Sequence, residues 1–210
     1  MSRIAGISLL FILAATAAVQ QDFLTADEVD QLRQVQEPNN RLWLYMQFAK
    51  QRIGMVEQLL GKEKPGRSVL IHDLLDQYTK IIDAVDTVAD DALHRKLDIA
   101  KGVAYVADEE KKLLESLRKI RESRPKDAAR YQFVLDQAFE TTADSMELSS
   151  QDVGTRARDV EARDEREDKE REAMMQPKDL EQKKAEQKKE EERKRKTPTL
   201  YRKGEQQKKQ

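Results

Sequence analysis

Two histidines are the first residues in this sequence whose type and spacing could do chemistry. His72 is followed by Asp76 four residues later, and His94 lies three residues after Asp91 and four before Asp98. Side chains three or four apart share one face of a helix, and helical bundles build metal sites from imidazole and carboxylate groups placed in this way. The spacing therefore predicts metal ligands at these five positions, provided that the fold brings the two histidines together.

Distance along the chain restricts this metal-site hypothesis. The histidines are 22 residues apart, which on one continuous helix corresponds to roughly 33 Å. Only a turn near residues 90–93 would let them share an ion. Because 38% of the residues are charged, a neighbouring aspartate also occurs often by chance. A metal-binding bundle is therefore kept as an alternative, and no resident cofactor is predicted.

Other kinds of reactive site are poorly provided for. The sequence contains no cysteine, which excludes disulfide frameworks and thiolate nucleophiles. It also has no glycine-rich phosphate loop, no G-x-S-x-G turn and no H-E-x-x-H helix. Adjacent carboxylates such as Asp90 and Asp91 point in different directions on a helix, so they make poor partners for acid–base catalysis. We therefore predict that the protein is not an enzyme.

The composition describes a chain that is only partly packed. It has 210 residues, enough for one or two domains, and its charged fraction of 38% exceeds the roughly 25% of an ordinary globular protein. The 39 basic and 40 acidic residues nearly cancel, to a formal charge of -1. Because the molecule as a whole is not a polycation, we expect no nucleic-acid partner.

The N-terminal segment is typical of a secretory signal peptide. Arg3 precedes an uncharged apolar run at residues 4–15, and Ala15, Thr16 and Ala17 form an A-x-A cleavage pattern. We predict a signal peptide at residues 1–18, cleaved after Ala17 or Ala18. An uncleaved anchor is the alternative, although the 16 residues 4–19 make only about 24 Å of helix against roughly 30 Å of hydrocarbon. Export without cysteine suits a bacterial periplasmic or secreted location.

Residues 19–150 have the apolar spacing of an all-α protein. Steps of three and four recur throughout, and no period-two alternation or hairpin signal interrupts them. Thr25 and Glu28 form a capping box, which places the start of a short helix at Ala26. Asn39 and Asn40 are candidate caps for the next helix, and Ser68 for the third. The two longest apolar stripes are Leu42, Met46, Ala49, Ile53, Val56 and Leu60, and Ile71, Leu74, Tyr78, Ile81, Val85, Val88 and Ala92.

The apolar frame slips by one residue near residues 90–93, and two arrangements fit. With a turn there, the helices make an up-and-down bundle of three to four helices with coiled-coil-like packing. Without a turn, one long helix forms a spine, since no Gly or Pro lies between Ser68 and Lys101. We favour the bundle because a helix of more than about 50 residues is rare. A last helix is expected to open at Asp127. The aromatic side chains are expected in the core or at its rim.

Residues 151–210 change character. They hold 16 acidic and 19 basic side chains, and the apolar frame ends near Val160. Acid-to-base pairs four apart, such as Glu165/Lys169 and Glu167/Arg171, favour a solvent-exposed helix. We predict a charged helix or low-complexity segment at residues 151–196 and a disordered tail at residues 197–210. The candidate electrostatic contact is the basic run Arg193, Lys194, Arg195 and Lys196.

Together these features predict an exported, non-enzymatic helical scaffold or interaction protein of the cell envelope. Its partner would be a protein or an anionic envelope surface that meets the basic run. Membrane contact would be confined to export unless the signal stays uncleaved. In that case the chain would be a membrane-tethered coiled-coil oligomer, and homo-oligomerisation through the heptad faces stays open.

Overall fold

The computed structural model describes residues 23–176 together with Asp179 and Lys189. The predicted signal peptide, the predicted disordered tail and the basic run at 193–196 lie outside these described residues. The chain divides into two compact units, Met1–Gln151 and Asp152–Gln210. None of the helices formed by the described residues combines the length and the apolar character that a membrane span requires.

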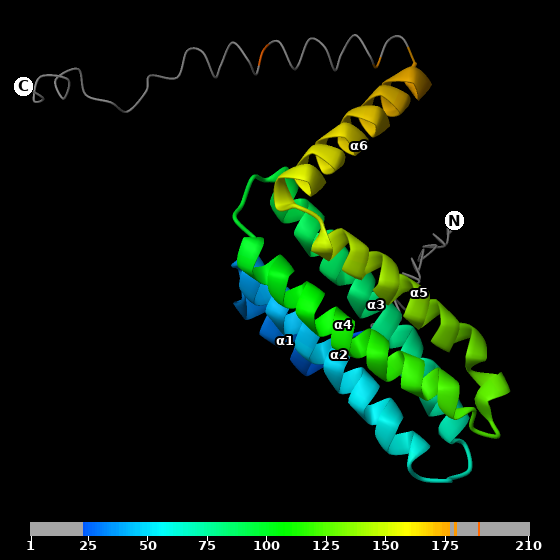
Figure 1. The fold of residues 1–210 in the computed structure, drawn as a ribbon. Coiled ribbons are helices and arrows are strands. Elements are labelled where there is room, and N and C mark those ends of the chain that lie inside the picture. Colours follow the sequence, from blue (N-terminus) through cyan, green and yellow to red (C-terminus); the bar gives the residue numbers. More distant parts are fainter. Residues whose placement is uncertain (1–22, 177–178, 180–188, 190–210) are drawn as a thin grey trace, which may run out of the picture. The chain divides into compact units, whose positions relative to one another are not determined.

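The described residues are all-helical (Figure 1), as the sequence predicts, and they contain no strand. The described residues form six α-helices, and the sequence predicts a bundle of three to four helices followed by a charged helical extension. In chain order they are α1 (Ala26–Gln34), α2 (Pro38–Leu60), α3 (Arg67–His94), α4 (Ala100–Ser123), α5 (Gln132–Ser150) and α6 (Val153–Met174), with a 3-10 turn, η1 (Ala128–Arg130), before α5.

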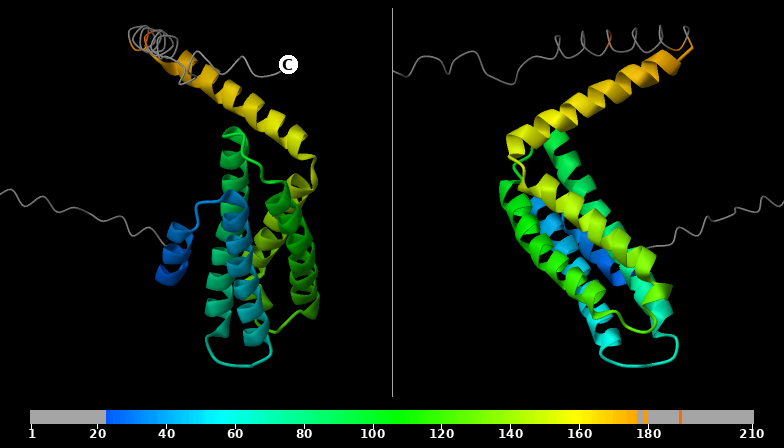
Figure 2. Two further views of the ribbon diagram at one scale, coloured as in Figure 1. Left: turned by 90° about the vertical axis from the view of Figure 1, so that its left-hand side faces the viewer. Right: turned by 45° about the vertical axis from the view of Figure 1, so that its right-hand side comes forward.

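Four long helices share one apolar core in the first unit. Helix α2 packs on α3 and α4, and α5 packs on the same two helices from the other side. Figure 2 shows these four side by side, with α1 outside them. Most residues of the two long stripes predicted from the sequence face the core, and Leu42, Ala49 and Tyr78 are fully buried. Leu60, Leu74 and Val88 of the same stripes are only partly buried. Removing these side chains from water supplies the main stabilisation of the unit.

The frame slip marks a turn rather than a continuous spine. Helix α3 ends at His94, and the turn occupies residues 95–99, slightly later than the sequence places it. Lys96 takes the left-handed conformation, with φ 57°, and the Leu97 amide donates to the Ala92 carbonyl at 2.9 Å. This pattern is a helix-ending motif that usually employs glycine. A lysine in that place leaves no glycine signal in the sequence.

The helix caps confirm one prediction and correct three. The Thr25 capping box starts α1 as predicted. Helix α2, however, is capped by the carboxylate of Glu37, which accepts from the amides of both Asn39 and Asn40. Helix α3 begins after Gly66, with no side-chain cap from Ser68. The helix expected to open at Asp127 instead begins at Gln132, after η1.

Asn39 has a different task from the cap predicted for it. Its side-chain oxygen accepts from the Gly102 amide at 2.7 Å, and its side-chain nitrogen donates to the Asp98 carbonyl at 2.9 Å. The Gly102 amide is one of the first amides of α4, which have no partner inside their own helix. A residue of α2 therefore caps α4. Gly102 permits the close approach, because a Cβ there would lie 2.8 Å from the Asn39 side chain.

The second unit contains α6, which the Asp152 side chain caps by accepting from the Thr155 amide at 3.0 Å. Lys169 pairs with Glu165 at 3.7 Å, as the spacing predicts. Arg171 pairs with Asp168 at 3.4 Å rather than with the predicted Glu167. Such exposed pairs each contribute about 0.2 to 0.5 kcal/mol to helix stability.

Candidate functional site

The two predicted histidine ligands lie near opposite ends of α3. The turn after α3 does not bring them together, because both precede it. His72 has Asp73 as its neighbour, with 3.5 Å between Nδ1 and Oδ1. Asp76, the ligand predicted beside His72, instead accepts from Lys80 Nζ at 2.7 Å. Along one helix the histidines stay roughly 33 Å apart.

The remaining predicted ligands also have local partners. Asp91 pairs with Arg95 at 3.0 Å, and a side-chain oxygen of Asp98 accepts from the Ala100 amide at 3.1 Å. Within residues 23–176, 179 and 189, no group of three or more His, Cys, Asp or Glu side chains is placed to hold a metal ion. The five-residue site gains no support from this geometry and stays a sequence prediction.

A buried ion pair holds α1 to the bundle. Arg52 of α2 donates from Nη1 and Nη2 to the two carboxylate oxygens of Glu28 at 2.7 and 2.6 Å. Its Nε donates to Gln77 of α3 at 2.8 Å, and Nη2 also reaches the Phe23 carbonyl at 3.2 Å. Both charged residues are almost inaccessible, at 2% exposure for Arg52 and 5% for Glu28. The bidentate geometry fixes the place of α1 on α2.

The charge of Glu28 is maintained by its partners. Burial opposes ionisation, but hydrogen bonds from Arg52 and from the Thr25 amide outweigh it, so the pKa of Glu28 lies below its ordinary value. One carboxylate therefore serves the capping box and the buried ion pair together. The sequence revealed the capping box from its spacing. It gave no sign of the ion pair, because Glu28 and Arg52 are 24 positions apart.

A second buried polar cluster joins α3, α4 and α5. The Thr142 hydroxyl donates to the Ala138 carbonyl at 2.6 Å, which leaves its oxygen to accept from the Tyr78 hydroxyl at 2.7 Å. Ser145 donates to a carboxylate oxygen of Glu110 at 2.6 Å. Burial, more than any other cause, raises the pKa of Tyr78. The four side chains Tyr78, Glu110, Thr142 and Ser145 are fully buried, so this cluster joins helices and is closed to a substrate.

A third polar tie closes the end of the bundle where α2 meets α3. Arg67 donates to both carboxylate oxygens of Asp127 at 2.9 and 2.8 Å. The same guanidinium donates to the carbonyls of Leu60 and Lys62 at 3.3 and 3.1 Å. Hydrogen bonding to Arg67 holds the pKa of Asp127 below its ordinary value. This tie fixes the turn before α5 against the loop between α2 and α3.

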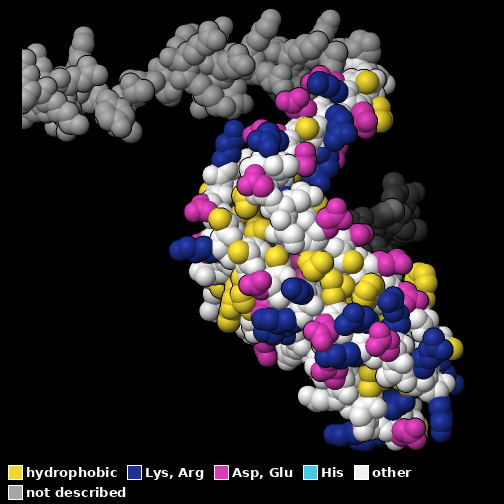
Figure 3. All heavy atoms as spheres, in the orientation of Figure 1, with side chains coloured by type: hydrophobic (Ala, Val, Ile, Leu, Met, Phe, Trp, Pro, Cys, Tyr) yellow, Lys and Arg dark blue, Asp and Glu magenta, His cyan; other side chains and the backbone are white. Residues whose placement is uncertain are grey.

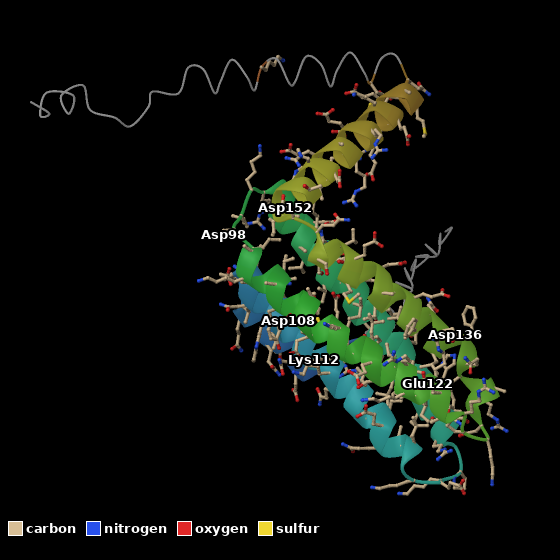
Figure 4. All side chains as sticks on the ribbon, viewed as in Figure 1. Asp98, Asp108, Lys112, Glu122, Asp136 and Asp152 are labelled. Carbon is tan, nitrogen blue, oxygen red and sulfur yellow. The ribbon has the colours of Figure 1, made fainter. Side chains whose placement is uncertain are left out.

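Charged groups on the outside of the bundle do not converge on one point. The buried carboxylate of Glu109 pairs at 2.6 Å with Lys50 of α2 and at 2.6 Å with Lys112 of its own helix, α4. Figure 4 shows Asp108, Lys112 and Glu122 following one another along α4. Figure 3 shows charged residues of both signs interspersed with apolar ones over α4 and α5. This distribution is typical of a solvated surface.

An open groove lies between α2 and α3 on the described surface of the bundle. We call it the outer groove. It has a volume of about 480 Å³, within the range of ligand-binding clefts. Its apolar lining comes from Met55 and Leu59 of α2 and from Leu70 and Leu74 of α3. The polar lining residues are Gln58, Lys62, Lys64, Asp73 and Gln77. No spacing argument from the sequence predicted this groove.

Two aromatic residues depart from the expected core positions. Phe133 is 81% exposed and Trp43 is 50% exposed, whereas Tyr78 and Tyr131 are buried. Apolar residues also reach the surface on α3, where Val69 and Leu70 are each more than half exposed. Single exposed apolar residues are ordinary. Leu70 lines the outer groove, and Val69 lines a smaller hollow of about 160 Å³ together with Ser68, His72 and Arg130.

Comparison with known proteins adds no relative. No protein-family model, no curated protein and no solved structure matches this chain.

Proposed function

We propose that this chain is an exported, non-enzymatic helical protein that acts by binding other molecules, as a scaffold or interaction factor of the cell envelope. The observation that carries the proposal is how the bundle uses its buried polar groups. Arg52, Arg67 and Glu110 each connect separate segments or helices within the bundle, and none of them lines the outer groove. Buried polar groups that bind other parts of the same bundle make the bundle rigid, and a rigid bundle suits binding to other molecules better than catalysis.

The finer architecture belongs to the same proposal. Successive long helices joined by short turns suit an up-and-down bundle with coiled-coil-like packing. Apolar steps of three and four along α2 and α3 support that packing. Such a bundle offers rigid outer faces on which a partner can dock.

Export is proposed from residues 1–18 alone. N-terminal sequencing of the protein recovered from an expressing bacterium tests it directly. A mature chain that starts at Ala18 or Val19 supports cleavage and export. A chain that is recovered in the membrane fraction and still begins with Met1 would contradict cleavage and favour the membrane-tethered coiled-coil oligomer. Crosslinking would then test whether the chains form that oligomer.

The basic run at residues 193–196 is proposed to make electrostatic contacts with an anionic envelope surface. Changing Arg193, Lys194, Arg195 and Lys196 to Gln should weaken co-sedimentation with phosphatidylglycerol vesicles, because each basic residue near such a surface contributes about 1 kcal/mol. The matched control changes four basic residues of α6, Arg163, Arg166, Lys169 and Arg171, to Gln. Equal losses in both variants would show that only net charge matters and would contradict a role for this run.

A further inference from the structure

Helix α2 carries a second apolar stripe beside the one that faces the core. Leu44, Phe48 and Arg52 follow one another at steps of four, so they share one face of the helix. Arg52 binds Glu28 of α1 on that face, and Leu44 and Phe48 are buried there at 8% and 4% exposure. Helix α1 therefore covers the first half of this stripe.

The second half of the stripe has no covering element among the described residues. Met55 and Leu59 continue the face three and seven positions after Arg52, and they line the outer groove opposite Leu70 and Leu74. Leu70 is 54% exposed. Met55, Leu59 and Leu74 are only partly buried, so four apolar side chains from two helices reach the surface at this groove. A cluster of apolar side chains that reaches the surface marks a site suited to binding.

The outer groove continues the interface that α1 already occupies. Gln77 lines the groove and also accepts from Arg52, the residue that holds Glu28. The helix-binding surface therefore ends on the same residue at which the open groove begins. From Leu70 to Gln77 the groove follows seven residues of α3, or about 10 Å of helix length. That length accommodates about two turns of another helix.

Charge at the groove favours an acidic occupant. Lys62 and Lys64 line the groove, and Asp73 is the only carboxylate among the described residues of its lining. The helix already bound on this face is itself acidic in its first turn, where it carries Asp27 and Glu28. An amphipathic helix with leucines on one side and carboxylates on its flank would match both the lining and the lysines.

We propose that the outer groove binds a short, acidic amphipathic helix of a partner protein, in line with α1. This inference rests on the proposed function as a binding protein and names the surface and the chemistry of its partner. Apolar contact with Met55, Leu59, Leu70 and Leu74 supplies the affinity. Lys62 and Lys64 select carboxylates on the flank of the incoming helix.

A synthetic peptide tests the proposal on the full chain. The probe is a fluorescein-labelled helical 12-residue peptide with leucines at positions 1, 4, 5 and 8 and glutamates on the flank. Fluorescence anisotropy measures its binding. A peptide of the same composition in scrambled order should bind at least about tenfold more weakly, because its leucines cannot enter the groove together. Equal binding of the two peptides would overturn the proposal.

Two neighbouring positions give a matched pair of variants. Leu70→Asp should weaken peptide binding about tenfold, since it removes the apolar contact of a leucine and places a carboxylate against a glutamate-bearing helix. Val69→Asp makes the same polar change at the adjacent residue, which is 61% exposed and lies outside the outer groove lining. It should alter binding by less than about twofold, within the usual range for surface substitutions. Equal loss in both variants would refute the proposed site.

Charge reversal provides a second variant that does not depend on the apolar lining. Lys62→Glu combined with Lys64→Glu should weaken the glutamate peptide and strengthen a version that carries lysine in place of glutamate. No change in this preference would refute the charge argument. Dodecanoate binding that Leu70→Asp abolishes, without any peptide binding, would instead identify an amphiphilic small molecule as the occupant. None of these outcomes depends on export, so N-terminal sequencing can fail while the groove proposal stands.

Discussion

The buried pair of Glu28 and Arg52 offers a test of how α1 is held. Glu28→Gln keeps the size of the side chain but removes the charge that faces a guanidinium with 2% exposure. Two hydrogen bonds to charged groups, at 2.7 and 2.6 Å, contribute about 1.5–3 kcal/mol each. Breaking one partner of such a buried pair costs about 3–5 kcal/mol if the helix stays in place.

Helix α1 need not stay in place, and this limits the measured effect. It has nine residues and packs chiefly on α2. If α1 detaches, the Arg52 side chain becomes solvated. The measured loss of stability then cannot exceed the free energy with which α1 docks on α2. We therefore expect Glu28→Gln to remove hydrogen-exchange protection from α1 amides while the amides of α2 to α5 keep theirs.

A double-mutant cycle isolates the interaction. Glu28→Gln, Arg52→Met and the double variant, compared by urea unfolding and hydrogen exchange of α1, should give a coupling energy of about 1–3 kcal/mol. The exposed pair of Arg33 and Asp30, on the same helix, serves as control. Arg33→Gln should cost less than about 1 kcal/mol. A coupling energy near zero for the buried pair would refute the conclusion that this pair holds α1 on α2. An equal loss of stability when either pair is broken would refute it too.

Three further predictions concern two glycines, the protonation of Glu28 and the C-terminal residues. Gly102→Ala should destabilise the bundle by about 1–3 kcal/mol, because its Cβ would lie 2.8 Å from Asn39 Oδ1. Gly54→Ala should stabilise α2 by up to about 1 kcal/mol, because a Cβ there has nothing within 4 Å. Chemical denaturation measures both changes, and changes of the same sign would refute the prediction. Acidification should release α1, because the pKa of Glu28 is lowered: the stabilisation is complete above the ordinary glutamate value of about 4.3 and is lost as pH falls through the lowered pKa. An α1 amide-exchange titration should show this step in the parent chain and not in Glu28→Gln. Removing residues 177–210 should shift the melting temperature by less than about 4 °C, and calorimetry showing a larger loss would assign the tail a structural role.

The sequence predicted the helical elements where a local signal exists. The capping box at Thr25 is satisfied by neighbours three residues apart, and the stripe through Leu42 and Ile53 repeats within one helix. Such patterns depend on the geometry of a single helix and can be read without knowing what packs against it. The α3–α4 turn was harder to predict, because Lys96 takes the left-handed position that glycine usually occupies at a helix end.

Local sequence patterns did not locate either the histidines relative to one another or the outer groove. His72 and His94 shared helix faces with carboxylates, yet the chain turns only after His94 and leaves both on α3. The outer groove depends on Leu59 and Leu70, which belong to different helices and become neighbours when α2 packs on α3. Among the described residues, α1 covers the part of α2 between Arg41 and Arg52 and does not extend over the groove.

Apolar period and capping chemistry, both local properties, thus determined that residues 23–150 form helices. Only the tertiary structure decided that Arg52 pairs with Glu28, that Asn39 caps α4, and that the described residues leave half of one α2 face open. The physical reason is that partners distant in sequence are chosen by which helix faces meet. That choice follows from the packing of the whole core, which no single segment encodes.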